Sequence, residues 1–229
     1  MIKTYFFGKN CIVDRGLKNI DDLVNNLKNQ QFNFQNILLL NQIHGNEVVV
    51  IDNKDKIYSE AQRPKADAIV CNLKEVVIGV VTADCSPILL FDNDKKIIGA
   101  CHAGWRGAKS GIIAETIIAM KRLGATNISA KIGPMIQQQS YEISSEFYHD
   151  FIAENIDNKI FFKPLANSVK MLFDLCGYVQ NKLRNQGISA IENCAIDTYF
   201  DEENFFSFRR STHQNQADCG RNISMIAIN

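Results

Sequence analysis

A close series of short apolar runs, each rich in Val, Ile and Leu, most limits how this chain can fold. In the first half of the chain they occupy residues 37–40, 48–51, 68–71, 76–82, 87–91 and 97–102. Short apolar runs bounded by turn-forming residues predict strands. Further segments of this character occur at 129–132, 188–196, 205–209 and 223–228. These segments are the predicted strands.

Helical periodicity is interspersed among the strands. In the segment 19–30, apolar residues from Ile20 to Leu27 keep the spacing of one helix face, and Asn19 is the expected N-cap. The same periodicity predicts helices from Gly107 to Gly124, at 145–155 and at 168–186. Because strands and helices do not alternate regularly, the sequence favours an α+β (mixed α/β) fold over a doubly wound one. We expect a layered sandwich in which helices cover mixed β-sheets.

Size and charge narrow the class of protein. The chain has 229 residues, 46% of them hydrophobic, and no internal repeat or Pro/Gly/Ser-rich linker, so one domain spanning 1–229 is expected. Lys plus Arg and Asp plus Glu number 25 each, which gives a formal net charge of zero. Without excess positive charge the chain is a poor candidate for binding duplex nucleic acid or an anionic membrane. Any bound anion must be met by local basic residues.

Cysteine usage and the N-terminal sequence indicate the compartment. Seven cysteines at irregular spacing do not resemble a disulfide framework, which favours a reducing environment. The N-terminal sequence MIKTYFFG lacks the features of a secretory signal. Apolar stretches such as 76–81 are far shorter than the roughly 20 residues of a membrane helix. The expected location is the cytoplasm.

Two neighbouring apolar runs predict a β-hairpin that brings a cysteine and a histidine together. With the hairpin centred between Asn93 and Asp94, Cys85 stands opposite His102. The Cβ atoms of directly opposed residues lie roughly 4.5 to 5.5 Å apart. At that separation a thiolate and an imidazole can share one metal ion or one proton.

His44 is a third candidate ligand, because it stands at a turn beside Gly45. With Cys85 and His102 it forms a three-ligand set, which leaves the fourth position of a zinc ion to water or substrate, as in catalytic sites. Cys101 precedes His102 on the strand and points to the opposite face, so it is predicted to lie in the core. The structural alternatives are a buried apolar Cys85, a turn-capping His44 and a core His102.

The chain also carries a set of short motifs in a fixed order. They are QIHG at 42–45, ADA at 66–68, TADCSP at 82–87, CHAGWRG at 101–107, IGP at 132–134 with YEI at 141–143, and FSFRR at 206–210 with GR at 220–221. This order resembles the laccase-domain family, also labelled polyphenol oxidase, purine nucleoside phosphorylase and peptidoglycan editing factor. The resemblance runs from about residue 36 to the C-terminus. It implies a layered α/β fold with zinc ligation by His44, Cys85 and His102.

The resemblance also implies an activity. Members of the family are described as cleaving adenosine, inosine and methylthioadenosine with phosphate, and as deaminating adenosine. Catalysis would then involve His44, Cys85 and His102 around a Zn²⁺ ion, with copper able to occupy the site in vitro. The partners would be a purine nucleoside and phosphate, with neither nucleic acid nor membrane. Whether the chain forms a homo-oligomer is left open.

Phosphate would have to be held by a few local groups. Arg106 stands near a predicted helix N-terminus, where an anion can meet free N–H groups. Arg209, Arg210 and Arg221 are the other candidates, and Asp84 is a substrate-side residue or the residue that orients a ligand histidine. Alternatively, Arg106 pairs with Asp84 or Glu115, and one of Arg209 and Arg210 forms a structural salt bridge.

The N-terminal segment, about residues 1–35, departs from the family pattern. Members usually begin with an Arg followed by a Gly-Gly-x-Ser stretch, whereas this chain reads FFGKNC at 6–11. Lys9 supplies the charge of the arginine but not its bidentate geometry. The shortened segment therefore leaves open whether phosphorolysis is preserved.

Other functions compete with zinc-dependent nucleoside cleavage. One is a metal-free hydrolase of cell-wall precursors, with Cys85 as nucleophile and His102 as base. Another is a nucleotide-binding module without catalysis. A blue-copper centre takes two histidines and a cysteine, and a multicopper oxidase needs further imidazoles, yet the chain has four histidines. Polyphenol oxidation would therefore be weak and depend on adventitious copper in the single site.

Overall fold

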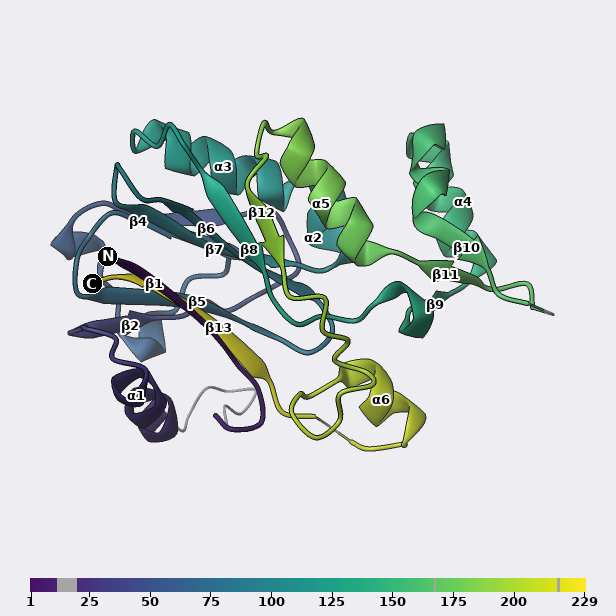
Figure 1. The fold of residues 1–229 in the computed structure, drawn as a ribbon, viewed down its shortest axis with the longest axis horizontal. Coiled ribbons are helices and arrows are strands. Elements are labelled where there is room, and N and C mark those ends of the chain that lie inside the picture. The colour runs from purple at the N-terminus through teal and green to yellow at the C-terminus, as the bar shows by residue number, and fades with distance from the viewer. Residues whose placement is uncertain (12–19, 167, 218) are drawn as a thin grey trace.

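A computed structural model describes residues 1–11, 20–166, 168–217 and 219–229 of the chain. Two β-sheets are stacked face to face, and helices cover their outer sides (Figure 1). The predicted mixed α/β sandwich is confirmed. Within the described ranges, no helix combines the length and the apolarity that crossing a membrane requires.

The sheets are built from segments far apart in the sequence. The four-stranded sheet has the order β1 (Ile2–Phe7), β13 (Asn222–Ile228), β5 (Val76–Thr82) and β2 (Asn36–Leu38). The six-stranded sheet has the order β12 (Ile191–Asn193), β8 (Ser129–Ile132), β6 (Ser86–Asp92), β7 (Ile97–Ala103), β4 (Ala68–Cys71) and β3 (Val48–Ile51). A small third sheet contains β10 (Phe162–Pro164), β11 (Met171–Phe173) and β9 (Glu142–Ile143). Parallel and antiparallel pairs occur in both large sheets.

Successive side chains along the central strands point to opposite faces of the sheet, and this explains the layers. On β7, Ala100 packs between the two sheets, whereas Cys101 packs on the helix-covered face, as predicted for that cysteine. That outer face is covered by α2 (Trp105–Ser110), α3 (Ile112–Arg122) and α5 (Leu175–Asn185). The opposite outer face is covered by α1 (Ile20–Asn29), and α4 (Ser145–Glu154) packs beside the small third sheet.

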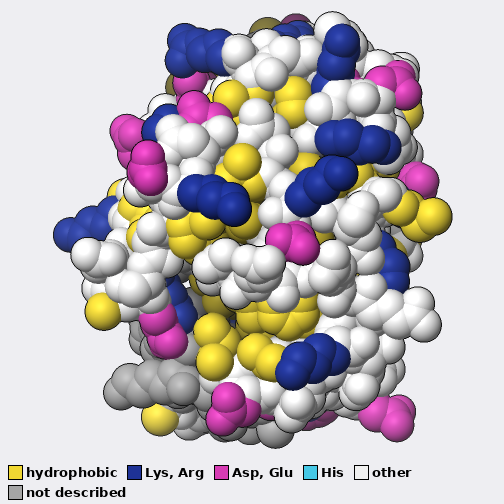
Figure 2. All heavy atoms as spheres, turned by 90° about the vertical axis from the view of Figure 1, so that its left-hand side faces the viewer, with side chains coloured by type: hydrophobic (Ala, Val, Ile, Leu, Met, Phe, Trp, Pro, Cys, Tyr) yellow, Lys and Arg dark blue, Asp and Glu magenta, His cyan; other side chains and the backbone are white. Residues whose placement is uncertain are grey.

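The remaining helical turns are short. They are α6 (Phe208–His213) and the 3₁₀ turns at Lys54–Lys56, Glu60–Gln62, Gln138–Ser140 and Ile156–Phe161. Figure 2 views the end of the sandwich where both termini lie, and basic, acidic and apolar side chains are interspersed there. The chain termini meet at this end, since Ile2 pairs with Ile228.

Several elements differ from the prediction because of local caps. The predicted helix at 168–186 begins only at Leu175, since the Asp174 carboxylate accepts the N–H of Gly177 at 2.7 Å and β11 precedes it. The predicted strand at 205–209 gives way to α6, because the Ser207 hydroxyl accepts the N–H of Arg210 at 3.1 Å. In both cases a side-chain cap outweighs the apolar pattern.

Two other boundaries also shift. The helix predicted from Gly107 starts earlier, at Trp105, and is divided into α2 and α3 at Gly111, whose φ is 98°. The strand predicted at 188–196 is confined to β12. The helices predicted at 19–30 and 145–155 are confirmed as α1 and α4, although the expected cap Asn19 lies outside the described residues.

The turn of the central hairpin is fixed by one carboxylate. Asp92 accepts the backbone N–H groups of Asp94 at 3.0 Å and Lys95 at 2.9 Å. Its other oxygen accepts those of Thr126 at 2.7 Å and Asn127 at 2.8 Å. The buried Asp92 therefore ties this turn to the segment that precedes β8.

Replacing Asp92 with Ala is expected to destabilise the fold by about 3 kcal/mol, because four buried or partly buried N–H groups lose their acceptor. Burial raises the pKa of Asp92, but the backbone N–H groups outweigh it and hold that pKa below its usual range. A depressed folded-state pKa stabilises above the unfolded value and loses its effect as pH falls. Denaturant unfolding should therefore show a smaller wild-type advantage at low pH than at neutral pH. Asp94→Asn, in the same turn, is the control, and equal stability of wild type and Asp92→Ala would contradict the prediction.

Candidate functional site

The structure brings the three predicted ligands together. His44 lies on the connection from β2 to β3, Cys85 lies on the connection from β5 to β6, and His102 lies on β7. One ligand atom from each residue lies within 4.8 Å of the others. The Sγ of Cys85 is 3.9 Å from Nε2 of His44, and the two histidine rings meet edge to face with centroids 4.7 Å apart.

The predicted hairpin register is wrong, although Cys85 and His102 do lie close together, as that register implied. Pro87, rather than Cys85, pairs with His102, because the turn held by Asp92 places the hairpin centre one residue further along. Cys85 precedes β6 and reaches the site from the loop. Both His44 and Cys85 lie where the chain crosses from the four-stranded sheet to the six-stranded sheet. The site therefore forms at the junction of the two sheets.

Asp67 holds two of the ligands in place. This buried carboxylate bonds to Nδ1 of His102 at 2.8 Å and accepts the N–H groups of Ile43 at 3.2 Å, His44 at 2.9 Å and Gly45 at 2.7 Å. With Nδ1 engaged, Nε2 of His102 remains for a ligand. The sequence reasoning did not single out Asp67, and its one signal was the ADA motif directly before a buried strand.

Asp84 does not orient a histidine, the role given to it as one possibility from the sequence. Asp67 is the carboxylate that bonds to the ring of His102. The Asp84 carboxylate accepts the Thr198 hydroxyl at 2.7 Å and the backbone N–H of Arg209 at 2.6 Å. The φ of Asp84 is 84°, in the left-handed region that few residues other than glycine adopt. Asp84 therefore anchors the loop that carries Cys85 to two other segments.

The charges of the site stabilise one another. Burial raises the pKa of Cys85, but the charge of His102 and hydrogen bonds from both histidines outweigh it, and its pKa is lowered to about 6. Burial lowers the pKa of His102, but the Cys85 thiolate and Asp67 raise it to about 9. Without a metal, the two shifts therefore favour the thiolate–imidazolium form of the pair.

Gly104 leaves the space that the ligands occupy. A Cβ atom at this position would lie 2.8 Å from Sγ of Cys85 and 3.3 Å from Cδ2 of His44. Both distances are shorter than ordinary van der Waals contact, so any larger residue would displace the ligands.

Gly104→Ala is therefore expected to weaken metal binding at the candidate site by at least about tenfold and to lower activity by about a hundredfold, because the geometry of the candidate ligands shifts. The backbone of Gly104 has a φ of −69°, which alanine adopts readily, so stability should change little. The control is Gly45→Ala, whose added Cβ meets its nearest atom at 3.6 Å. Zinc titration and melting curves test this, and a Gly104→Ala protein with wild-type zinc affinity would refute it.

The three ligands face a cleft of about 680 Å³. Its lining includes Gln42, whose side-chain amide bonds both the N–H and the C=O of Val81 at 2.8 Å. Arg63, Phe208 and the predicted Arg221 also line it. Neither Arg63 nor Phe208 is predicted from the sequence as a site residue, although Phe208 belongs to the FSFRR motif at 206–210.

The other predicted arginines have different surroundings. None of Arg106, Arg209 and Arg210 is among the described residues that line the cleft. The Arg209 guanidinium lies 5.3 Å from the centre of the Tyr141 ring, and the Arg106 guanidinium lies 4.9 Å from the centre of the Trp105 ring. Arg209 also donates to the carbonyl of Glu142 at 2.8 Å.

Arg210 performs a structural task. Its guanidinium donates to the carbonyls of Thr198 at 2.6 Å, Tyr199 at 2.9 Å and Phe205 at 2.6 Å. These bonds already engage the donors that a bound phosphate would need, which does not support the predicted phosphate-binding role of Arg210. Arg221 lies in the cleft and donates to the carbonyls of Cys219 and Gly220.

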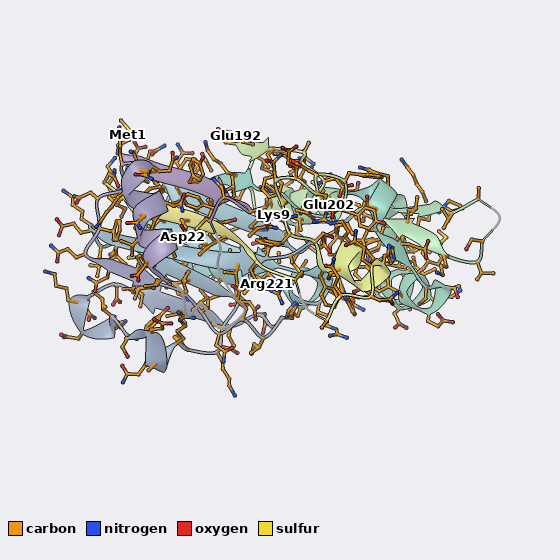
Figure 3. All side chains as sticks on the ribbon, turned by 90° about the horizontal axis from the view of Figure 1, so that it is seen from below. Met1, Lys9, Asp22, Glu192, Glu202 and Arg221 are labelled. Atoms are coloured by element: carbon orange, nitrogen blue, oxygen red, sulfur yellow. The ribbon has the colours of Figure 1, made fainter. Side chains whose placement is uncertain are left out.

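Lys9 lies away from the described lining of the cleft. Its Nζ donates to the carbonyl of Glu202 at 2.5 Å, and Figure 3 shows the two residues side by side. Lys9 also lies 5.6 Å from the centre of the Phe206 ring. In this structure Lys9 therefore contacts the loop before α6.

Comparisons with known proteins identify relatives. A Rickettsia conorii protein named purine nucleoside phosphorylase is 40% identical over 197 residues, which is 85% of this chain and 80% of that protein. An Escherichia coli protein with the same enzyme name is 33% identical over 172 residues, 75% of this chain and 67% of the relative.

Solved structures share the fold. The crystal structure of the Neisseria meningitidis protein NMB0706 superimposes with a TM-score of 0.80 at 26% identity and covers 100% of this chain and 94% of its own. A Bacillus licheniformis protein gives a TM-score of 0.82 at 21% identity, with 100% and 93% coverage. The family model described as multi-copper polyphenol oxidoreductase laccase matches residues 15–229. The chain therefore belongs to this laccase family, as its motifs indicated.

Proposed function

We propose that this protein is a zinc-dependent purine nucleoside phosphorylase that cleaves adenosine, inosine and methylthioadenosine, and that it also deaminates adenosine. The observation that carries the proposal is the convergence of His44, Cys85 and His102 within 4.8 Å beside a cleft of about 680 Å³. The Rickettsia conorii and Escherichia coli relatives, both named purine nucleoside phosphorylase, support the reaction class.

The donor set fits a zinc ion. Two imidazoles and a thiolate are typical zinc ligands, and the lowered pKa of Cys85, about 6, favours the thiolate that binds metal. A zinc ion held by these three residues would supply Lewis acidity toward water or substrate. The same donors suit copper. Among the described residues this is the one cluster of the kind, which supports a single-metal site.

The chain's own groups would position the substrates. In phosphorolysis a phosphate oxygen bonds to C1′ of the ribose while the bond from C1′ to the base breaks, and the base takes the electron pair and a proton. Arg221 supplies positive charge within the cleft, Arg209 supplies it beside Tyr141, and Arg106 supplies it beside Trp105. Deamination instead replaces the 6-amino group with oxygen from water and releases ammonia. Asp67 and Asp84 hold the ligand loops during either reaction.

The test is to incubate the zinc-loaded protein with adenosine, with and without phosphate, and to separate the products by chromatography. Adenine and ribose 1-phosphate that form only with phosphate support phosphorolysis, and inosine supports deamination. A wild-type protein holding about one zinc ion per chain that forms neither adenine nor inosine would overturn the proposal.

The metal-free hydrolase is the second candidate, and the ionisation of the site favours it. The Cys85 thiol lies within 4.8 Å of a ring nitrogen of His102, which can accept its proton as base, and the lowered pKa of Cys85, about 6, favours the thiolate nucleophile. Hydrolysis of cell-wall precursors by the zinc-free protein would support this function. Tight purine binding without turnover would instead indicate a binding module.

The chain's organisation and its cysteines bear on how and where the protein acts. We propose that residues 1–229 act as one catalytic domain, because the site draws on both large sheets. All seven cysteines are free thiols, which supports a reducing compartment such as the cytoplasm.

A further inference from the structure

An exposed aromatic ring lies in the cleft beside the candidate metal ligands. Phe208 is the first residue of α6 and is 60% exposed, yet it shares the lining of the cleft with His44, Cys85 and His102. An exposed phenyl ring gains free energy when a flat apolar surface covers it. Within a substrate-sized cleft, such a ring is a surface for a ligand.

The backbone that carries this ring is fixed to the site. The N–H of Arg209, the next residue, donates to the Asp84 carboxylate at 2.6 Å, and Asp84 directly precedes Cys85. The carbonyl of Phe208 accepts the Ser211 hydroxyl at 2.9 Å, which closes the first turn of α6. The Phe208 backbone is therefore held relative to Cys85 before any ligand arrives, which lowers the ordering cost of binding.

Trp105 directly follows Gly104, which adjoins the candidate ligands, but its ring already packs against other side chains. It packs against Phe147 with centroids 4.7 Å apart, and the guanidinium of Arg106 lies 4.9 Å from its centre. Among the described residues that line the cleft, Phe208 is the aromatic residue apart from the two histidines.

We propose that Phe208 is the platform on which the purine base of the nucleoside stacks, a role that rests on the proposed function. Stacking on an aromatic ring is tolerant of base identity, because every base has a π-face. A stacking platform therefore accepts adenine and hypoxanthine alike, and it favours the larger purine ring over a pyrimidine. Arg221, on the same cleft, supplies charge for the phosphate.

The first test compares steady-state kinetics of the zinc-loaded variants. Phe208→Ala is expected to raise KM for adenosine about tenfold, while KM for phosphate stays unchanged. Phe208→Trp should preserve the wild-type KM, because it keeps a stacking surface. The matched control is Phe200→Ala, since Phe200 is 67% exposed but is not among the described residues that line the cleft. An unchanged KM for adenosine in Phe208→Ala would overturn the platform.

Calorimetric binding of adenosine to the zinc-loaded protein without phosphate separates this proposal from the proposed function. If the wild type binds adenosine here but forms no adenine in the separate assay with phosphate, the phosphorylase proposal fails, while about tenfold weaker binding by Phe208→Ala still supports the platform. If the wild type turns adenosine over and Phe208→Ala binds it equally well, the platform alone fails. Binding of catechol but not adenosine, lost in Phe208→Ala, would assign the ring to phenols and overturn the purine platform.

Discussion

Cys85→Ser is expected to abolish both zinc retention and nucleoside cleavage. The thiolate is present at neutral pH because the pKa of Cys85 is about 6, whereas a serine hydroxyl stays protonated and binds zinc weakly. Losing an outer residue that supports a ligand typically costs about 10- to 100-fold in metal affinity or activity. The loss of a ligand itself should exceed about a hundredfold in kcat/KM. Elemental analysis and the adenosine assay on the same preparation measure both effects.

The control is Cys194→Ser, because Cys194 is an exposed thiol that is not among the described residues lining the cleft. It should retain wild-type zinc content and activity. A Cys85→Ser protein that keeps about one zinc ion per chain would place the metal elsewhere. One that loses zinc but keeps full activity would favour neither zinc catalysis nor a Cys85 nucleophile.

Asp67→Asn is expected to lower both stability and metal affinity. The carboxylate is buried and serves three backbone N–H groups as well as His102, so removing its charge leaves the histidine without its ionic partner. Breaking a buried pair of this kind costs about 3–5 kcal/mol. Zinc affinity should fall about 10- to 100-fold, because His102 and the His44 loop lose their support.

Thermal unfolding with and without zinc, together with zinc titration, measures the two effects of Asp67→Asn separately. Asp52→Asn is the control, because its ion pair with Lys56, at 2.7 Å, lies on the surface, where such pairs contribute little to stability. An Asp67→Asn protein that keeps both the wild-type melting temperature and the wild-type zinc affinity would show that the His44 loop is held by other contacts.

The clustering of the three candidate ligands could be predicted from residue type and local position. His44 stands beside a glycine at a turn, and Cys85 and His102 lie at the ends of apolar runs. Asp67 could not be selected in the same way, because its partners lie 22 to 35 residues away in the sequence. Its role depends on which strands become neighbours, and the hydrophobic pattern does not specify this.

The adjacent residues Arg209 and Arg210 form different contacts, and the sequence alone does not predict which contact each one forms. Arg209 and Arg210 look equivalent, yet Arg210 points inward to backbone carbonyls, while Arg209 reaches Glu142. The Ser207 cap starts a helix where the apolar pattern predicted a strand, and the helix decides which way each side chain points. The exposed position of Phe208 follows from the same cap.

The position of the ligands at the junction of the sheets has a thermodynamic consequence. His44 and Cys85 lie on connections that leave the four-stranded sheet, and His102 belongs to the six-stranded sheet. The ligand set is therefore complete only when the two sheets are docked against each other. A metal ion that binds the docked state and not the separated one stabilises it by mass action. Metal binding is then thermodynamically linked to the docking of the two sheets. A substitution at the interface between the sheets, even far from the cleft, is therefore expected to alter metal affinity.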